Sequence, residues 1–365
     1  MNLDNYKVEF LRETVHLKEL SDAEYFSSDY KQYVSNSKLK LINPDEGGSP
    51  QKFRDGIKSE YNASFEFGTS VHELILQPEE FVLSDYPFKP SAKLGLFVDN
   101  VIKYRAKGLS IKDSMLKASD KADYYKGKLS PKIIKTAMQK GLKYYYDAVF
   151  NDIHSDEFGR EVIILNEKLQ RDVASCIDAV NGNVKIRKLL HSQNFTDTIK
   201  YFNEEAIFID IAVTLPNGEV VIIPFKLKFD NYSIDPEIKL VTLNDLKTTG
   251  KPVSYFMGDH IPTLDENGKK IGEQWINGSF QNYRYYRQIA IYMLVLQWYL
   301  KSQNYNDYTY QANMMVVEST PDFKSEVYPI SQSYIKQGLL EFKELICRVA
   351  WHEYNGYDKQ LNEDE

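Results

Sequence analysis

The spacing of apolar positions changes along the chain, from a helical period in the first half to strand-like runs in the middle. Residues 95–150 and 160–192 carry apolar side chains at helical spacing, which predicts several helices. Apolar runs then cover residues 206–215 and 220–225, and they flank the turn sequence Pro-Asn-Gly-Glu at 216–219. This pattern predicts a β-hairpin, and the whole chain is expected to have an α/β fold.

Weaker signals divide the rest of the chain. Ser35 is placed to cap a short helix that Asn43-Pro44 ends, and apolar spacing from Val71 to Leu76 predicts a helix that carries His72. The other expected elements are a helix and an irregular arm within 1–30, a long helix at about 280–301, a strand near 313–318 and a closing helix at about 331–353.

Asp245 and Lys247 stand two residues apart in an apolar, β-branched stretch. In a strand, side chains at i and i+2 share a face. A carboxylate beside an ammonium is costly to bury unless something binds there, and a divalent cation with a phosphate would be such a ligand. The alternative is a surface strand with an incidental ion pair, since Asp-x-Lys occurs by chance in many proteins.

Other polar residues have spacings that suit the same site. Asp230 precedes Asp245 by 15 residues, with turn-forming residues between them. Two antiparallel strands would therefore bring both acids to one end of a sheet. Gln288 and Tyr292 share one face of the predicted long helix, with Arg284 one turn earlier. His72 lies beside an apolar stripe, where a histidine is more often a hydrogen-bonded core residue than a metal ligand.

Composition narrows the class of protein. The 365 residues are 42% hydrophobic and 27% charged, which is typical of a soluble globular protein of one large or two ordinary domains. We find no apolar run long enough to span a membrane and no basic-then-apolar leader, so a cytoplasmic protein is expected. The two cysteines, Cys176 and Cys347, cannot hold an iron–sulfur cluster or a structural zinc on their own.

The charge is unevenly distributed. The chain has a net charge of −7, which disfavours nucleic acid as a partner, but residues 103–143 contain twelve Lys or Arg against three Asp. Six tyrosines between 104 and 146 are interleaved with these bases. Such a segment fits a surface that follows phosphates, and it fits equally the solvated face of a helical insertion.

Taken in chain order, Gly68-x-x-x-His72, Asp230, Asp245-x-Lys247 and Gln288-x-x-x-Tyr292 resemble the RecB/RecE branch of the PD-(D/E)XK nuclease superfamily. The resemblance is greatest to the exonuclease VIII (RecE)-like group of phages and prophages. Residues 35–43, 68–81, 245–249 and 315–357 look like segments of that group, so nearly the whole chain is covered.

The resemblance implies an α/β fold with a restriction-endonuclease-like core, in which helices flank a mixed central sheet. The expected parts are an N-terminal arm at 1–60, a nuclease domain at 61–357 with a basic helical insertion at about 95–150, and an acidic tail at 358–365.

The resemblance also implies roles for individual residues. His72, Asp230, Asp245 and the main-chain carbonyl of Leu246 would hold one or two Mg²⁺ or Mn²⁺ ions. Lys247 would orient the attacking water or stabilise charge on the phosphate, and Gln288 and Tyr292 would lie near the nucleophile or the DNA. The expected DNA contacts are Arg284, Arg287, Lys132 and Lys135.

One position departs from the group's pattern. The first acid lies in Lys-Phe-Asp230, where the group has Arg-x-Asp, and the segment that leads to Asp245 is longer. Asp235 is therefore the alternative first metal ligand. Replacing Lys247 with alanine is expected to abolish cleavage and to leave folding almost unchanged.

The function that this resemblance implies is a metal-dependent exonuclease that hydrolyses linear double-stranded DNA in phage-type recombination or replication. Expected partners are DNA ends, a single-strand annealing protein and further copies of the chain in a ring, within a bacterial or phage-infected cell. The alternatives are an endonuclease or single-strand-specific nuclease of the same superfamily, and an inactive DNA-binding scaffold. The cysteine count excludes the iron–sulfur nucleases of this superfamily.

Overall fold

The computed structural model of the chain describes residues 2–18, 20–56, 63–85, 88–126, 128, 130–150, 154–190, 198–264, 266, 269–319 and 322–361. They form two compact units. The first unit comprises Met1–Ser59, Gly182–Glu318 and Lys324–Glu365, and the second comprises Glu60–Asn181 and Ser319–Phe323. The expected basic insertion at 95–150 lies within the second unit, and the last four residues of the acidic tail lie outside the described residues.

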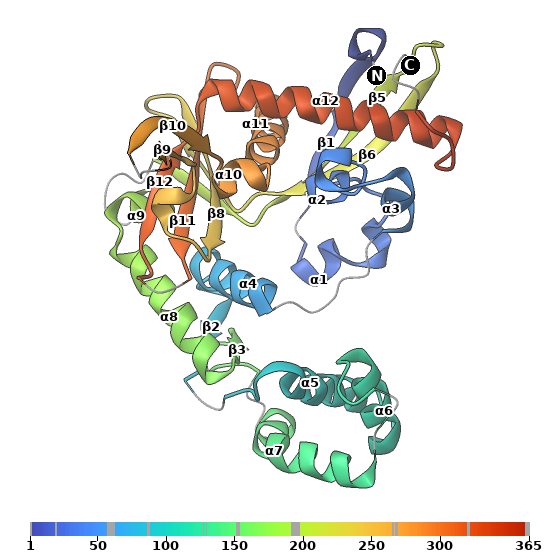
Figure 1. Ribbon diagram of the computed structural model, residues 1–365, viewed down its shortest axis with the longest axis vertical. Coiled ribbons are helices and arrows are strands. Elements are labelled where there is room, and N and C mark those ends of the chain that lie inside the picture. The colour runs from blue at the N-terminus through green and yellow to red at the C-terminus, as the bar shows by residue number, and fades with distance from the viewer. Residues whose placement is uncertain are drawn as a thin grey trace. The chain divides into compact units, whose positions relative to one another are not determined.

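The first unit is a mixed α/β structure (Figure 1). Its strands are β1 (Lys7–Lys18), β4 (Lys200–Asn203), β5 (Ala206–Thr214), β6 (Val220–Lys228), β7 (Asn231–Asp235), β8 (Leu240–Thr249), β9 (Asp259–Leu264), β10 (Lys270–Ile276), β11 (Thr309–Glu318) and β12 (Ser325–Pro329). Its helices are α1 (Asp22–Tyr25), α2 (Asn36–Leu39), α3 (Pro50–Asp55), α9 (Val184–Leu190), α10 (Ser279–Asn282), α11 (Tyr285–Ser302) and α12 (Gln332–Asn355).

A mixed five-stranded sheet with the order β12-β11-β8-β7-β4 organises the first unit. β8 is central, since it pairs in parallel with β11 along its whole length and antiparallel with β7. A three-stranded sheet β1-β5-β6 and the separate hairpin β9-β10 complete the strands. The apolar residues of both larger sheets join those of α11 and α12, which pack against each other, in one core.

The predicted hairpin is confirmed. β5 and β6 pair antiparallel with Thr214 opposite Val220, and Gly218 between them adopts a positive φ of 86°, which glycine tolerates without steric cost. Asp230 and Asp245 are expected on two adjacent antiparallel strands, with Asn231 and Tyr232 in the turn between them. The structure differs, because the strand that pairs antiparallel with β8 is β7, which begins at Asn231. β6 ends at Lys228 and pairs with β5 in the other sheet.

Two local predictions are wrong. Residues 7–18, expected as helix or irregular arm, form the long strand β1 against β5. The pairing register shifts between Leu11 and His16, which interrupts the alternation by which a strand is recognised. The expected helix at 280–301 is two helices, because Arg284 adopts a left-handed backbone conformation with φ 54° between α10 and α11.

An asparagine ladder crosses four strands of the large sheet. Asn231 donates to Asn203 at 2.7 Å, Asn244 donates to Asn231 at 2.7 Å, and Asn313 donates to Asn244 at 3.0 Å. Each of these pairs is also a register pair of its two strands. Because a slip of one residue would leave these buried amides unpaired, the ladder specifies the register of β4, β7, β8 and β11.

The second unit contains β2 (Phe81–Leu83), β3 (Glu161–Ile163), α4 (Ala63–Leu76), α5 (Ala92–Ala106), α6 (Ile111–Lys121), α7 (Pro131–Phe150) and α8 (Glu167–Gly182). Helices α5, α6 and α7 share a core of their own around Phe97, Val98 and Val101. Gly141 lets α7 approach α5 closely, since a Cβ atom there would lie 2.5 Å from Val98 Cγ2. No helix among the described residues is long and apolar enough to cross a membrane.

The ladder generates a prediction about stability. Replacing Asn244 with leucine leaves the amides of Asn231 and Asn313 buried without their partner, which costs about 1–3 kcal/mol for each unpaired group. We expect the urea midpoint of unfolding to fall with its slope unchanged. The exposed Asn5→Leu variant is the control and should unfold like the parent. Equal midpoints for the two variants would contradict the role of the ladder.

Candidate metal and catalytic site

Asp245 lies on β8 with its side chain 1% exposed. It follows Asn244 directly, so the ladder and this carboxylate project from opposite faces of the sheet. On the Asp245 face, Gln288 of α11 donates from Nε2 to Oδ1 of Asp245 at 3.1 Å. The register that the ladder specifies therefore also determines where this buried acid meets α11.

Lys247 shares the face of Asp245 and directs its ammonium at three oxygen groups. Nζ forms an ion pair with Asp245 Oδ2, donates to the Leu246 carbonyl at 3.1 Å and lies 3.9 Å from Asp230 Oδ2. Burial alone would lower the pKa of Lys247, but the Asp245 and Asp230 carboxylates outweigh burial and raise it. The ammonium therefore remains charged, and it sits at the centre of the oxygen set that the sequence predicted for a metal.

Asp230 lies at the junction between β6 and β7 and is tied to β8. Its Oδ2 accepts a hydrogen bond from the Leu246 N–H at 2.7 Å, one residue beyond Asp245. Asp235, the alternative first ligand, lies at the other end of β7 opposite Leu240. Its carboxylate accepts from the N–H groups of Glu237 and Ile238 and caps a turn there. The structure thus brings Asp230, and not Asp235, beside Asp245.

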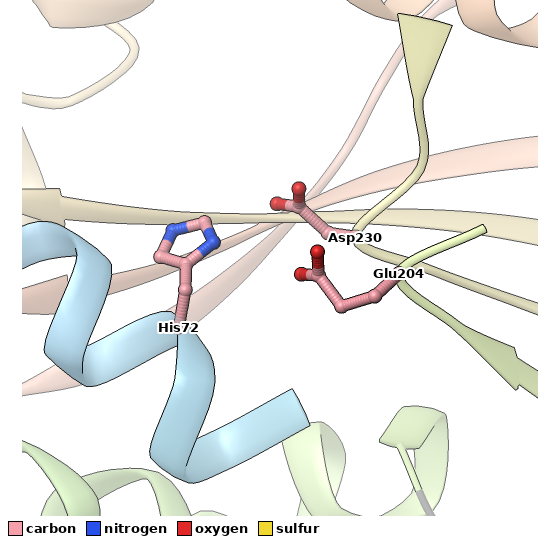
Figure 2. Close-up of side chains that lie close together, drawn as sticks. All are labelled: His72, Glu204 and Asp230. Atoms are coloured by element: carbon pink, nitrogen blue, oxygen red, sulfur yellow. The ribbon is translucent and has the colours of Figure 1, made fainter. Parts of the chain in front are cut away.

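A third carboxylate, which the sequence did not indicate, belongs to the same place. Glu204 lies between β4 and β5, and its N–H donates to the Asp230 carbonyl at 3.1 Å. Its side chain pairs with Lys228 at 2.6 Å, and its backbone is left-handed with φ 56°. A carboxylate oxygen of Glu204 lies within 4.8 Å of one of Asp230 (Figure 2). A non-glycine residue held in this conformation is a reason to look for function.

These side chains suit a divalent cation chemically. Asp230, Asp245 and Glu204 supply hard carboxylate oxygens, the donors that Mg²⁺ and Mn²⁺ prefer. The ammonium groups of Lys228 and Lys247 balance two of these three carboxylates, so the five side chains together carry one net negative charge. His72 is carried by α4 of the second unit. Its imidazole, with the carboxylates of Glu204 and Asp230, makes a donor set that could hold a metal ion (Figure 2).

Gln288 and Tyr292 lie together, one helical turn apart on α11. Gln288 Nε2 donates to the Tyr292 hydroxyl at 3.2 Å as well as to Asp245. Burial raises the pKa of Tyr292 well above its usual value, and the nearby Tyr25, Asp245 and Asp230 add to the rise against the opposing hydrogen bond from Gln288. Tyr292 therefore stays a neutral phenol, which can donate a proton in a hydrogen bond to an anion or a water.

The four residues expected to contact DNA differ in their availability. Arg287 has a side chain 2% exposed and pairs with Glu46 at 2.8 Å and Glu341 at 2.7 Å. Arg284 pairs with Glu341 and Asp45. A phosphate contact through either arginine would require breaking these ion pairs, which link α11 to α12 and the Pro44–Glu46 segment. Lys132 and Lys135 lie exposed on α7 of the second unit.

Tyr285 is a second residue of the site that sequence reasoning missed. The Lys247 ammonium lies 5.4 Å from the centre of the Tyr285 ring, and the charge of Lys247 opposes the rise that burial causes in the pKa of this phenol. A sequence signal existed for Tyr285, since it precedes Gln288 by three residues and so shares a helix face with it. No spacing rule connects Glu204 to the site.

No protein-family model matches this chain, and no curated protein matches it. Among solved structures, the crystal structure of a protein from Eubacterium rectale named "putative exonuclease" is similar, with a TM-score of 0.44. The two chains are 12% identical, and the match covers 94% of this chain and 89% of the other. A similarity this distant carries no argument about function, which must be argued from the site itself.

The site generates a prediction about Lys247. From the sequence alone, Lys247→Ala should leave folding almost unchanged. The buried ion pair predicts instead that this variant is less stable than the parent. Removing one partner leaves the Asp245 carboxylate buried without its cation, which costs about 3–5 kcal/mol when a pair is fully buried. Because Lys247 is 15% exposed, we expect a loss of about 3 kcal/mol in the free energy of unfolding in EDTA, measured by urea titration.

The matched control removes both charges. In the double variant Asp245→Asn with Lys247→Met, no charge is left uncompensated, so most of the lost stability should return. If the single variant unfolds like the parent, or if the double variant is no more stable than Lys247→Ala, the ion pair does not have this role.

Proposed function

We propose that this protein is a metal-dependent nuclease of the PD-(D/E)XK type with a restriction-endonuclease-like core, and that it digests linear double-stranded DNA from its ends. The observation that carries the proposal is the Lys247 ammonium held by the Asp245 and Asp230 carboxylates and the Leu246 carbonyl. These are the groups that the sequence resemblance assigns to metal binding and phosphate activation. Their convergence gives that resemblance a geometric basis in the first unit.

The residues of the site have complementary roles in this proposal. Asp230, Asp245, the Leu246 carbonyl and Glu204, with His72, would hold Mg²⁺ or Mn²⁺, which when bound lowers the pKa of a coordinated water and screens the phosphate charge. Lys247 stabilises negative charge that develops on the phosphate, because its ammonium stays protonated beside two carboxylates. Gln288 orients Asp245 through its amide, and the Tyr292 phenol in turn accepts from that amide.

The wider expectations follow from the resemblance alone. Action on duplex ends, a ring of several copies, an annealing partner and a place in phage-type recombination stay predictions. The exonuclease is distinguished from an endonuclease by its preference for linear over closed circular DNA, and from a scaffold by cleavage itself.

The first functional prediction concerns cleavage. The parent should digest end-labelled linear duplex with Mg²⁺ or Mn²⁺ but not with EDTA, and it should leave covalently closed circles intact. Lys247→Ala should cleave about 10²–10³-fold more slowly, because one charge-stabilising donor is lost from the transition state. Lys251→Ala removes an exposed lysine just beyond the same strand and should cleave like the parent.

Each departure from this result has a definite meaning. Cutting of closed circles would identify an endonuclease, and digestion restricted to single strands would identify the single-strand-specific alternative. A parent that cleaves nothing with either metal would be the inactive scaffold. Normal cleavage by a folded Lys247→Ala variant would refute the assignment of Lys247.

The second functional prediction concerns the metal ligands. Glu204→Gln, Asp230→Asn and His72→Ala should each weaken Mn²⁺ binding by at least about tenfold, because removal of even an outer-shell partner costs 10–100-fold. Binding is measured by titration of free Mn²⁺ with electron paramagnetic resonance. Glu219→Gln, which neutralises an exposed acid in the β5–β6 turn, is the control and should bind like the parent. Unchanged binding by Glu204→Gln would remove Glu204 from the ligand set.

A further inference from the structure

The second unit contains a cavity of about 500 Å³ whose lining is rich in basic residues. Five of its lining residues are Lys or Arg and one is acidic: the basic residues are Lys89, Lys140, Lys143, Lys168 and Arg171. Its volume is within the range of ligand-binding pockets, at about 300–1,000 Å³. The cavity therefore has room for a ligand larger than a single phosphate, in surroundings of positive charge.

Two helices and one non-helical segment line this cavity. The segment Phe88–Ser91, which leads into α5, lines it together with the middle of α7 and the first two turns of α8. Asn166 caps α8, since its Oδ1 accepts from the Leu169 N–H at 3.1 Å. The close approach of α7 to α5 at Gly141 fixes the wall from which Lys140 and Lys143 extend. Helix packing thus positions the α7 side of the cavity.

Two of the five cations already have partners. Lys89 lies 2.7 Å from both Glu66 and Asp99, and the Tyr144 hydroxyl donates to Asp99 at 2.7 Å. Burial alone would lower the pKa of Lys89, but Asp99 and Glu66 outweigh burial and raise it. Lys143 pairs with Asp147 at 2.9 Å. These paired groups contribute little free positive charge to the cavity.

The other three cations are different. Lys140, Lys168 and Arg171 form no ion pair with any residue in the described part of the chain. Glu167, the acidic lining residue, occupies the first turn of α8, where the helix dipole favours a negative charge. Three unpaired cations around one cavity repel one another, and an anion with several oxygens would relieve that repulsion. Phosphate is such an anion, and arginine binds it in a bidentate geometry.

The lining also offers groups for the rest of a nucleotide. Phe88 is 39% exposed at the cavity, and an exposed aromatic ring can stack on any base without sequence preference. Ser91 is the N-cap of α5, yet its hydroxyl caps no N–H of that helix. We propose that this cavity binds a phosphate-bearing nucleotide unit of a DNA strand, at Lys140, Lys168 and Arg171. The choice of DNA rests on the proposed nuclease function.

The test compares two triple variants that change the charge equally. Lys140→Glu, Lys168→Glu and Arg171→Glu reverse the unpaired cations of the cavity. Lys107→Glu, Lys112→Glu and Lys117→Glu reverse exposed lysines of the same unit that do not line it. Binding of a fluorescent single-stranded oligonucleotide and of its duplex is measured by anisotropy in EDTA, over a range of salt concentrations. Circular dichroism checks that both variants are folded.

We expect the cavity variant to bind DNA at least about tenfold more weakly than the control variant. The slope of log K against log salt should fall by about 1 for each phosphate contact that is lost. Equal losses in the two variants would overturn the proposal, as would a parent that binds no DNA. If the charge-reversed variant does not fold, Lys140→Gln, Lys168→Gln and Arg171→Gln remove the same charges and must show the same loss.

Free inorganic phosphate is the alternative ligand, since it offers the cavity the same phosphate oxygens as DNA. Inorganic phosphate, added as competitor at the same concentration of phosphate groups, should displace little of the oligonucleotide from the parent. Displacement as effective as that by unlabelled oligonucleotide would assign the cavity to free phosphate and overturn the DNA assignment. Because binding is measured without metal, the outcome is independent of cleavage. Loss of binding in a protein that never cleaves would support the cavity while refuting the nuclease.

Discussion

The first unit depends on one constraint, which is that several carboxylates are brought together where solvent is largely excluded. Asp245 is buried and Asp230 is nearly so, and a buried carboxylate is costly unless a cation pairs with it. Lys247 supplies that cation from the same strand, and it is positioned by its i, i+2 spacing from Asp245. The carboxylate oxygens that suit the site to a metal are therefore the same ones whose charge the folded chain must balance with Lys247.

This constraint explains why the register of β7 and β8 matters. Asp230 reaches β8 only because Asn231 pairs with Asn244, and a one-residue slip would turn Asp245 to the other face of the sheet. The asparagine ladder makes such a slip costly on the face opposite the carboxylates. Polar residues on one face of the sheet thus hold the site on the other in place.

The sequence could predict the parts of the site that follow from short-range rules. The pairing of Asp245 with Lys247 follows from strand period, and that of Gln288 with Tyr292 from helix period. Glu204 could not be predicted in this way, because it meets Asp230 through a junction between strands and adopts a backbone conformation that no pattern signals. β1 was missed for a related reason, since a register shift within it disrupts the alternation of buried positions.

The distribution of partners among the charged residues also changes how the net charge should be understood. A net charge of −7 disfavours nucleic acid if all charges are taken as equally available. The carboxylates of the first-unit site form ion pairs that leave one net negative charge, and Arg284 and Arg287 are also paired. Lys140, Lys168 and Arg171, in contrast, line a cavity of the second unit without ion-pair partners among the described residues. Because ion pairs cancel locally, unpaired cations dominate the potential that an approaching phosphate meets. An acidic chain can therefore present a basic binding surface.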